Sequence, residues 1–363
     1  MTNSLELARF HQVERDGSRD HRSLEYAARP LLSAFLAMSP SAIDLRDQRD
    51  RRLRDKLRRE LGGDVLSALS DASVVEVMLN ADGELWVERL GSGVAPLGGT
   101  MSRSQAENLL GTVAALAETE INEGRPLLEV ELPFDGSRFH GVVSPVSSAP
   151  VFAIRKRAVR VHTLDDYVDG GILAPGGRDA LRAALGRREN IVICGGTGSG
   201  KTTLANALLR EAVELAGPCE RFVILEDTVE LQCTAANHIQ LRTTDEIDLT
   251  RLVRATMRLR PDRIVIGEIR GREALALLKA WNTGHPGGVT TVHANSAGAA
   301  LSRIDQLIQE AGVPSQPQLI AESVDLIVSI ARCNGGRRVE ELLQVEGYEQ
   351  GRGYQLSRIE VGC

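Results

Sequence analysis

The stretch GGTGSGKT, residues 195–202, constrains the fold of this chain more than any other segment. It follows the apolar run IVIC and precedes TTLANALLRE, which has the composition of a helix. A match to G-x-x-x-x-G-K-[ST] between a strand and a helix predicts a phosphate-binding loop. Glycines let backbone N–H groups turn towards phosphate oxygens, and the start of the following helix adds a favourable dipole.

The residue types in this loop predict how a nucleotide is held. Lys201 is expected to reach the β- and γ-phosphates, and the Thr202 hydroxyl is expected to bind Mg²⁺. A guanine-reading N-K-x-D segment is absent from the sequence, which favours ATP over GTP. The predicted nucleotide-binding residues are Gly195, Gly196, Thr197, Gly198, Ser199, Gly200, Lys201, Thr202 and Thr203.

The chain divides into parts of different character. From about Leu173, apolar β-branched runs alternate with helical segments, which predicts an α/β fold: a parallel sheet flanked by helices. The residues before it contain a strand pair around NADG, one helix and a strand-rich segment, which predict a smaller α+β domain. The expected parts are an N-terminal extension, in part disordered (1–40), the α+β domain (41–157), a linker (158–172), the P-loop domain (173–345) and a tail (346–363).

Carboxylates follow two strands of the predicted sheet. Glu226 and Asp227 end the run FVIL, and Glu268 follows RIVIG. ATP hydrolysis needs a carboxylate that orients water, so Glu226 and Glu268 are both candidates for the general base. Thr202, Asp227 and Glu268 are the candidate Mg²⁺ ligands. The alternatives are capping of a turn by Glu226 and Asp227, and an ion pair between Glu268 and Arg270.

The segment TGHPGGVTTVHANS, residues 283–296, contains two histidines. His293 follows the apolar run VTTV, so we expect it at the same sheet edge, beside the phosphate loop and Glu268. There it could bind a γ-phosphate or a carboxylate; a buried core histidine is the alternative. His285 is expected in a turn. The two histidines are eight residues apart with no nearby cysteine, which disfavours a metal pair.

Arginines on the segment DLTRLVRATMRLRPD have two interpretations. Arg251, Arg254 and Arg258 share one face of the predicted helix, which is typical of a solvated surface. Alternatively they act on the nucleotide of a neighbouring subunit, with Arg258 and Arg260 favoured because they are nearest in sequence to the strand of Glu268. A second charged segment, residues 44–61, predicts either an ion-paired helix or a surface that contacts anionic lipid or nucleic acid.

Composition excludes several classes of protein. The 363 residues carry a net charge of -6, so no excess of positive charge advertises nucleic-acid binding. No apolar run approaches the roughly 18 residues that span a membrane, and we expect a cytoplasmic protein. Disulfide frameworks and cysteine-based zinc sites are disfavoured because the five cysteines are scattered: Cys194, Cys219, Cys233, Cys333 and Cys363.

Four segments together resemble the secretion and traffic ATPases of type II and type IV systems. In chain order they are GGTGSGKT, LEDTVEL, RPDRIVIGEIRG and GHPGGVTTVHANS, which correspond to the Walker A, Asp, Walker B and His boxes of that family. The segments MLNADGELWVERLG and PVFAIRKR are most similar to the conjugation branch, the TrbB-type ATPases. The tight-adherence pilus ATPases are close rivals.

The resemblance implies a RecA-like P-loop domain and a homo-hexameric ring that works with inner-membrane secretion or conjugation components, with peripheral membrane association as an option. It also implies that nucleotide lies between the two domains and that arginines of the N-terminal domain act as catalytic residues beside Lys201, Glu226, Glu268 and His293. Arg138 in GSRFHG and Arg155 in FAIRKR match those arginines.

The expected function is an ATPase that drives substrate transfer or pilus assembly. A DNA translocase is a second interpretation, which the net charge of -6 disfavours. The sequence does not decide whether the protein binds DNA directly. A non-catalytic nucleotide switch is a third, which the presence of Lys201, Glu226, Glu268 and His293 disfavours.

Overall fold

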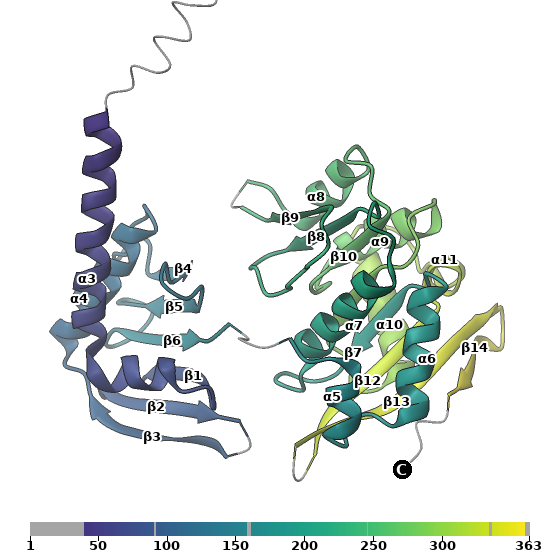
Figure 1. Ribbon diagram of the computed structural model, residues 1–363, viewed down its shortest axis with the longest axis horizontal. Helices are drawn as coiled ribbons and strands as arrows, with labels where there is room; N and C mark the ends of the chain where they lie inside the picture. Colours follow the sequence, from purple (N-terminus) through teal and green to yellow (C-terminus); the bar gives the residue numbers. More distant parts are fainter. Residues whose placement is uncertain (1–39, 91, 158–160, 245, 334–335, 360–363) are drawn as a thin grey trace, which may run out of the picture. The chain divides into compact units, whose positions relative to one another are not determined.

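The chain divides into two compact units between Lys156 and Arg157 (Figure 1). The structure is a computed structural model. No helix among the described residues is long and apolar enough to cross a membrane. The predicted extension over residues 1–40 lies outside the described residues except for its last residue. The residues described are 40–90, 92–157, 161–244, 246–333 and 336–359.

The first unit is an antiparallel sheet with two helices on one face. Its strand order is β3-β2-β1-β6-β5-β4, and α3 (Pro40–Ser70) and α4 (Arg103–Leu116) supply the helical side of the core. Ser102 caps α4 in a capping box with Gln105. The predicted strand pair around NADG is confirmed as β1 with β2. The strands are β1 (Val74–Leu79), β2 (Glu84–Arg89), β3 (Gly93–Thr100), β4 (Leu127–Glu131), β5 (Arg138–Val142) and β6 (Val151–Arg155).

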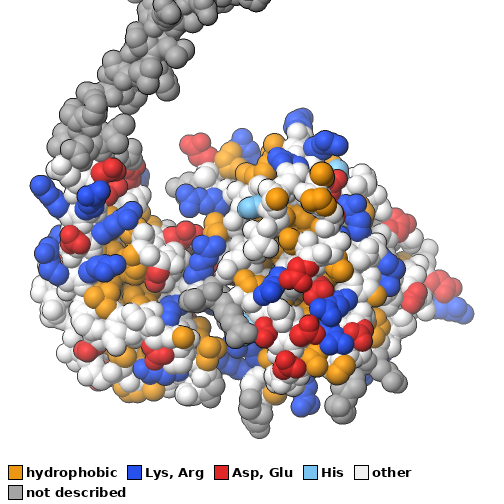
Figure 2. Space-filling model, viewed as in Figure 1, with side chains coloured by type: hydrophobic (Ala, Val, Ile, Leu, Met, Phe, Trp, Pro, Cys, Tyr) orange, Lys and Arg blue, Asp and Glu red, His pale blue; other side chains and the backbone are white. Residues whose placement is uncertain are grey.

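The predicted charged helix forms the middle of α3. Its exposed side chains include Arg49, Arg52 and Arg59, and Figure 2 shows Lys and Arg side chains gathered over this part of the molecule. Lys56 Nζ lies 3.5 Å from Glu60 Oε1, an i,i+4 ion pair. The segment is therefore an exposed, charged surface.

The second unit contains an eight-stranded sheet in the order β14-β13-β12-β7-β11-β10-β8-β9. The six strands from β12 to β9 in this spatial order pair in parallel with their neighbours. Strand β13 pairs antiparallel with β12, and β14 pairs antiparallel with β13. The strands are β7 (Ile191–Cys194), β8 (Phe222–Glu226), β9 (His238–Arg242), β10 (Arg263–Ile266), β11 (Val289–Val292), β12 (Leu326–Cys333), β13 (Gly336–Glu349) and β14 (Gly353–Arg358).

Helices cover both faces of this sheet, because the buried strands are apolar on both sides. One core takes side chains from α5 (Leu164–Asp169), α6 (Pro175–Gly186) and α7 (Lys201–Leu215). The opposite core takes them from the remaining helices (Figure 1). These are α8 (Leu249–Thr256), α9 (Glu273–Asn282), α10 (Ala297–Gln309) and α11 (Pro317–Ser323).

The described residues of the two boundary segments of the second unit belong to its packed structure. The range 158–172, expected as a linker, contains α5, whose Leu164 and Tyr167 are buried in the core. The range 346–363, expected as a tail, contributes the end of β13 and all of β14. The parallel strands β7, β8, β10 and β11 end at one edge, where ligands bind in sheets of this kind.

Candidate nucleotide-binding and catalytic site

The phosphate-loop sequence connects the buried strand β7 to α7, as predicted. Gly195 has no room for a side chain, because a Cβ there would collide with the Ile330 carbonyl oxygen and the Ser199 hydroxyl. Gly200 is the residue before α7 and has a φ of 101°, which side-chain-bearing residues rarely adopt. Thr202 and Thr203 lie in the first turn of α7 and are half-buried. The loop backbone is therefore set by packing against β12 and by glycine conformations.

Lys201 points back across the mouth of this loop. Its Nζ donates hydrogen bonds to the carbonyl oxygens of Gly195 (3.0 Å) and Gly196 (3.1 Å), and the residue is only 7% exposed. The same Nζ lies 3.4 Å from His293 Nδ1. A buried ammonium group at the mouth of the loop is placed to meet phosphate oxygens.

Glu268 and His293 meet at the carboxyl ends of neighbouring strands. His293 Nε2 lies 2.8 Å from Glu268 Oε1, although this oxygen has no hydrogen bond of good geometry. Arg270 holds the other oxygen, Glu268 Oε2, with Nη2 at 2.6 Å and Nε at 2.9 Å. The histidine contact is a close approach of the two side chains rather than a hydrogen bond of good geometry. Glu268 therefore lies beside His293, as predicted, and also forms the ion pair with Arg270 that was the alternative.

The surroundings of His293 favour its neutral form. Burial and the positive charge of Lys201 lower the pKa of the imidazole, and Glu268 opposes them without reversing the direction. A neutral imidazole at neutral pH offers one donor and one acceptor. His285 lies before β11 rather than after it, and its Nδ1 is 2.9 Å from the Pro261 carbonyl oxygen. The two histidines therefore lie at opposite ends of one strand and cannot share a metal ion.

Glu226 has a different environment at the end of β8. Its side chain accepts hydrogen bonds from the backbone N–H groups of Glu230 (2.9 Å) and Leu231 (2.8 Å), and from Gln240 Nε2 (2.7 Å). The residue is 3% exposed, and burial raises the pKa of its carboxyl group despite these three donors. Its neighbour Asp227 is exposed and accepts a hydrogen bond from Thr243 Oγ1 at 3.2 Å. Glu226 is arranged as the anchor of a turn.

The predicted Mg²⁺ ligands have suitable chemistry. A threonine hydroxyl and carboxylates are hard oxygen donors, and Mg²⁺ is usually held by one or two of them together with phosphate oxygens and water. Thr202 lies in the first turn of α7, while Asp227 and Glu268 follow β8 and β10. Among the described residues, no group of three or more His, Cys, Asp or Glu side chains could hold a metal alone. The donor set fits a nucleotide-dependent Mg²⁺ site.

The two predicted arginines of the first unit are neighbours. Arg138 on β5 and Arg155 on β6 are directly opposite each other in the sheet. Glu131 is opposite Arg138, and Glu76 is opposite Arg155, so acidic residues flank the pair. All four alternate with buried residues such as Phe139 and point away from the helix-covered face.

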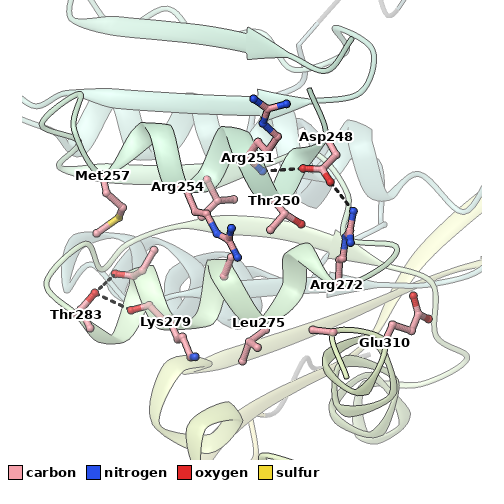
Figure 3. Close-up of a pocket in the computed structure, with 14 residues that line it drawn as sticks. Asp248, Thr250, Arg251, Arg254, Met257, Arg272, Leu275, Lys279, Thr283 and Glu310 are labelled. Atoms are coloured by element: carbon pink, nitrogen blue, oxygen red, sulfur yellow. Dashed lines mark hydrogen bonds and ion pairs between the residues drawn. The ribbon is translucent and has the colours of Figure 1, made fainter. Parts of the chain in front are cut away.

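The predicted arginines of α8 lie away from the phosphate loop. Arg251 and Arg254 line a surface groove of about 740 Å³ between α8 and α9, together with Arg272 and Lys279 (Figure 3). Arg258 and Arg260 precede β10, so they lie at the strand end opposite Glu268. The length of β10 therefore separates both arginines from Glu268 of the same chain.

Two residues beside the site carried no sequence signal. Gln240 lies on β9, the strand that pairs with β8, and its Nε2 donates to Glu226 Oε2 and to the Leu231 carbonyl oxygen. Arg337 lies on β13 and donates to the carbonyl oxygen of Gly198, 139 positions earlier in the chain. Neither residue belongs to a motif, and only the strand order places them at the site.

A parallel sheet with a glycine-rich strand-to-helix loop, a strand-end carboxylate and a nearby histidine is typical of P-loop nucleotide-binding proteins. Residues 60–360 match the family of type II/IV secretion system proteins, and the chain belongs to this family. The recognition of this family and the α/β fold class expected from the sequence are confirmed.

Individual proteins agree with this assignment. The chain is 52% identical over 297 residues to the conjugal transfer protein TrbB of Rhizobium radiobacter, covering 82% of this chain and 91% of that protein. A probable TrbB of Sinorhizobium fredii is also 52% identical, with 83% and 92% covered. The X-ray structure of the Legionella pneumophila ATPase DotB has the same fold, with a TM-score of 0.58, 20% identity and coverage of 77% and 79%. These findings support the function expected from the sequence, an ATPase of type IV secretion or conjugation.

Proposed function

We propose that this protein binds Mg²⁺-ATP at residues 195–203 and hydrolyses it to drive a conjugal transfer or type IV secretion machine. The observation that carries the proposal is the chain of contacts from Lys201 to His293 to Glu268. It brings a phosphate-binding cation, a neutral imidazole and a carboxylate to one edge of the sheet. A phosphate-binding cation and a carboxylate that positions the attacking water are recurring parts of phosphoryl-transfer sites.

Glu268 is the general base in this proposal. Its side chain is 18% exposed, and Arg270 holds its Oε2 through charge rather than through backbone turns, while Oε1 is buried beside His293. A base must lie within hydrogen-bond reach of the water that it activates. Both oxygens of Glu226 are occupied by donors of the fold, so this residue positions the turn that follows β8.

Lys201 and His293 act on the phosphates. The carbonyl oxygens that now accept from Lys201 are weaker partners than a phosphate anion, so the ammonium group can transfer its hydrogen bonds to the ligand. The neutral His293 has one N–H group, which can turn from Glu268 to a γ-phosphate oxygen. Mg²⁺ held by Thr202, with Asp227 or Glu268 through water, would neutralise phosphate charge.

Arg138 and Arg155 supply further positive charge to the phosphates in this proposal. Placing two arginines opposite each other is costly unless acidic groups or an anionic ligand compensate. Glu76 and Glu131 provide partial compensation, and a phosphate would provide the rest. Replacement of either arginine by Ala is expected to lower kcat by about 10³-fold. The exposed Arg125 is the matched control, and its replacement is expected to leave kcat unchanged.

The working form in this proposal is a cytoplasmic homo-hexamer that docks on inner-membrane components. The support is family membership together with the similarity to conjugal transfer proteins. A ring in which neighbours complete each site has an activity that depends on protein concentration.

The test is the ATP hydrolysis rate per subunit over a dilution series, with Lys201→Ala as the blank. The proposal predicts hydrolysis well above the blank and a per-subunit rate that falls on dilution. Hydrolysis that stays at the level of the blank at every concentration would contradict the ATPase assignment. A constant rate, with sizing that finds monomers, would contradict the ring while leaving the chemistry intact.

A further inference from the structure

Arg337 lies against the phosphate loop from the side opposite to the catalytic residues. It is the second residue of β13, which pairs with β12, and β12 pairs with the loop strand β7. Its Nε and Nη2 lie 3.4 and 3.5 Å from the Gly198 carbonyl oxygen. Its stem covers Gly200, where an added Cβ would lie 2.8 Å from Arg337 Cδ. Arg337 and the loop are therefore in direct contact.

The guanidinium group of Arg337 is not neutralised by the described part of the chain. Its two hydrogen bonds are long and share one neutral carbonyl oxygen, and no described carboxylate lies within 4.0 Å of it. The residue is half-buried. A half-buried arginine without a carboxylate retains most of its donors for a ligand.

The strand order gives the direction in which a nucleotide must lie. Strand β7 is flanked by β11 on one side and by β12 on the other. Glu268 and His293 follow β10 and β11, so the γ-phosphate end points to that side. A nucleotide is an extended molecule held by its phosphates, and its ribose and base must leave towards β12 and β13. Arg337 lies on that side.

We propose that Arg337 binds the base end of the nucleotide, with its guanidinium plane stacked on the adenine ring. This inference rests on the proposed nucleotide site and adds a residue that no motif indicates. The bonds to Gly198 fix the plane beside the loop, and the aliphatic stem on Gly200 limits its movement. A cation over an aromatic ring in a partly desolvated site strengthens binding about 5- to 30-fold.

The experiment measures the affinity of Arg337→Ala for two probes by calorimetry. ADP contains the base, whereas inorganic pyrophosphate has the same number of phosphates and no base. The proposal predicts that ADP affinity falls about 5- to 30-fold and that pyrophosphate affinity stays within about twofold of the wild type. Arg337→Lys keeps the charge without the plane and should recover only part of the ADP affinity.

Two outcomes would overturn the proposal. Equal losses for ADP and pyrophosphate would mean that Arg337 supports the loop or binds phosphate, and unchanged ADP affinity would mean that it does not contact the nucleotide. Arg338→Ala is the matched control, because this exposed neighbour points to the other face of β13. The Arg338→Ala protein should bind both probes with wild-type affinity. A wild-type protein that binds neither ATP nor ADP would instead contradict the proposed function itself.

Discussion

The carboxyl ends of β8 and β10 lie side by side in the sheet and each presents a glutamate, yet the two side chains have opposite environments. Glu226 is 3% exposed and receives three hydrogen bonds from groups of the fold. Glu268 is partly exposed and faces the charged or titratable side chains of Arg270 and His293. One carboxylate completes a turn, and the other remains available for chemistry.

The comparison teaches that position at a strand end does not by itself define a catalytic carboxylate. A buried acceptor that satisfies backbone N–H groups is committed, because leaving those groups unpaired costs free energy. A carboxylate held by side-chain charges can exchange those partners for water or a phosphate-bound ion. Substitution of Glu226 should therefore lower the free energy of unfolding, and substitution of Glu268 should lower the catalytic rate.

The largest expected effect is on turnover. Glu268→Gln removes the base while keeping the shape, and kcat should fall by about 10²- to 10⁴-fold with little change in ATP affinity. Glu226→Gln keeps a carbonyl oxygen for Glu230 and Leu231, and its kcat should stay within about tenfold of the wild type. Steady-state phosphate release at saturating Mg²⁺-ATP measures both. If the ranking were reversed, Glu226 would be the base.

Glu226→Ala should affect stability most. The substitution leaves the N–H groups of Glu230 and Leu231 without their acceptor, and we expect the free energy of unfolding to fall by about 2–4 kcal/mol. Glu268→Ala should change it by less than about 1 kcal/mol. Fluorescence of Trp281 in a Trp86→Phe background reports urea unfolding of the second unit alone, because the chain has only these two tryptophans. Equal destabilisation by both substitutions would remove the distinction.

The smallest expected effect is on the titration of His293. Its lowered pKa means that the folded chain binds fewer protons here than the unfolded chain, so this group costs stability as the pH falls below about 6.5. NMR of the imidazole proton, assigned with His293→Asn, should give a midpoint below the ordinary value. Lys201→Ala should raise the midpoint, and Glu268→Gln should lower it further. A midpoint insensitive to both substitutions would mean that the three side chains do not interact.

The local parts of the site could be predicted from the sequence. The phosphate loop, the strand before it and the position of His293 after β11 follow from motif and periodicity over short segments. The contacts of Gln240 with Glu226 and of Arg337 with Gly198 could not be predicted. They depend on strand order and on which end of a strand a residue occupies, and both are set by packing between distant segments.

The most direct test of the account identifies the nucleotide that each glutamine variant retains. Glu268→Gln and Glu226→Gln are incubated with Mg²⁺-ATP, freed of unbound nucleotide, quenched in acid and analysed by chromatography. The account predicts intact ATP on Glu268→Gln, because binding survives without the base, and ADP on Glu226→Gln. ADP on both variants, or ATP only on Glu226→Gln, would contradict the assignment of the catalytic carboxylate to the end of β10.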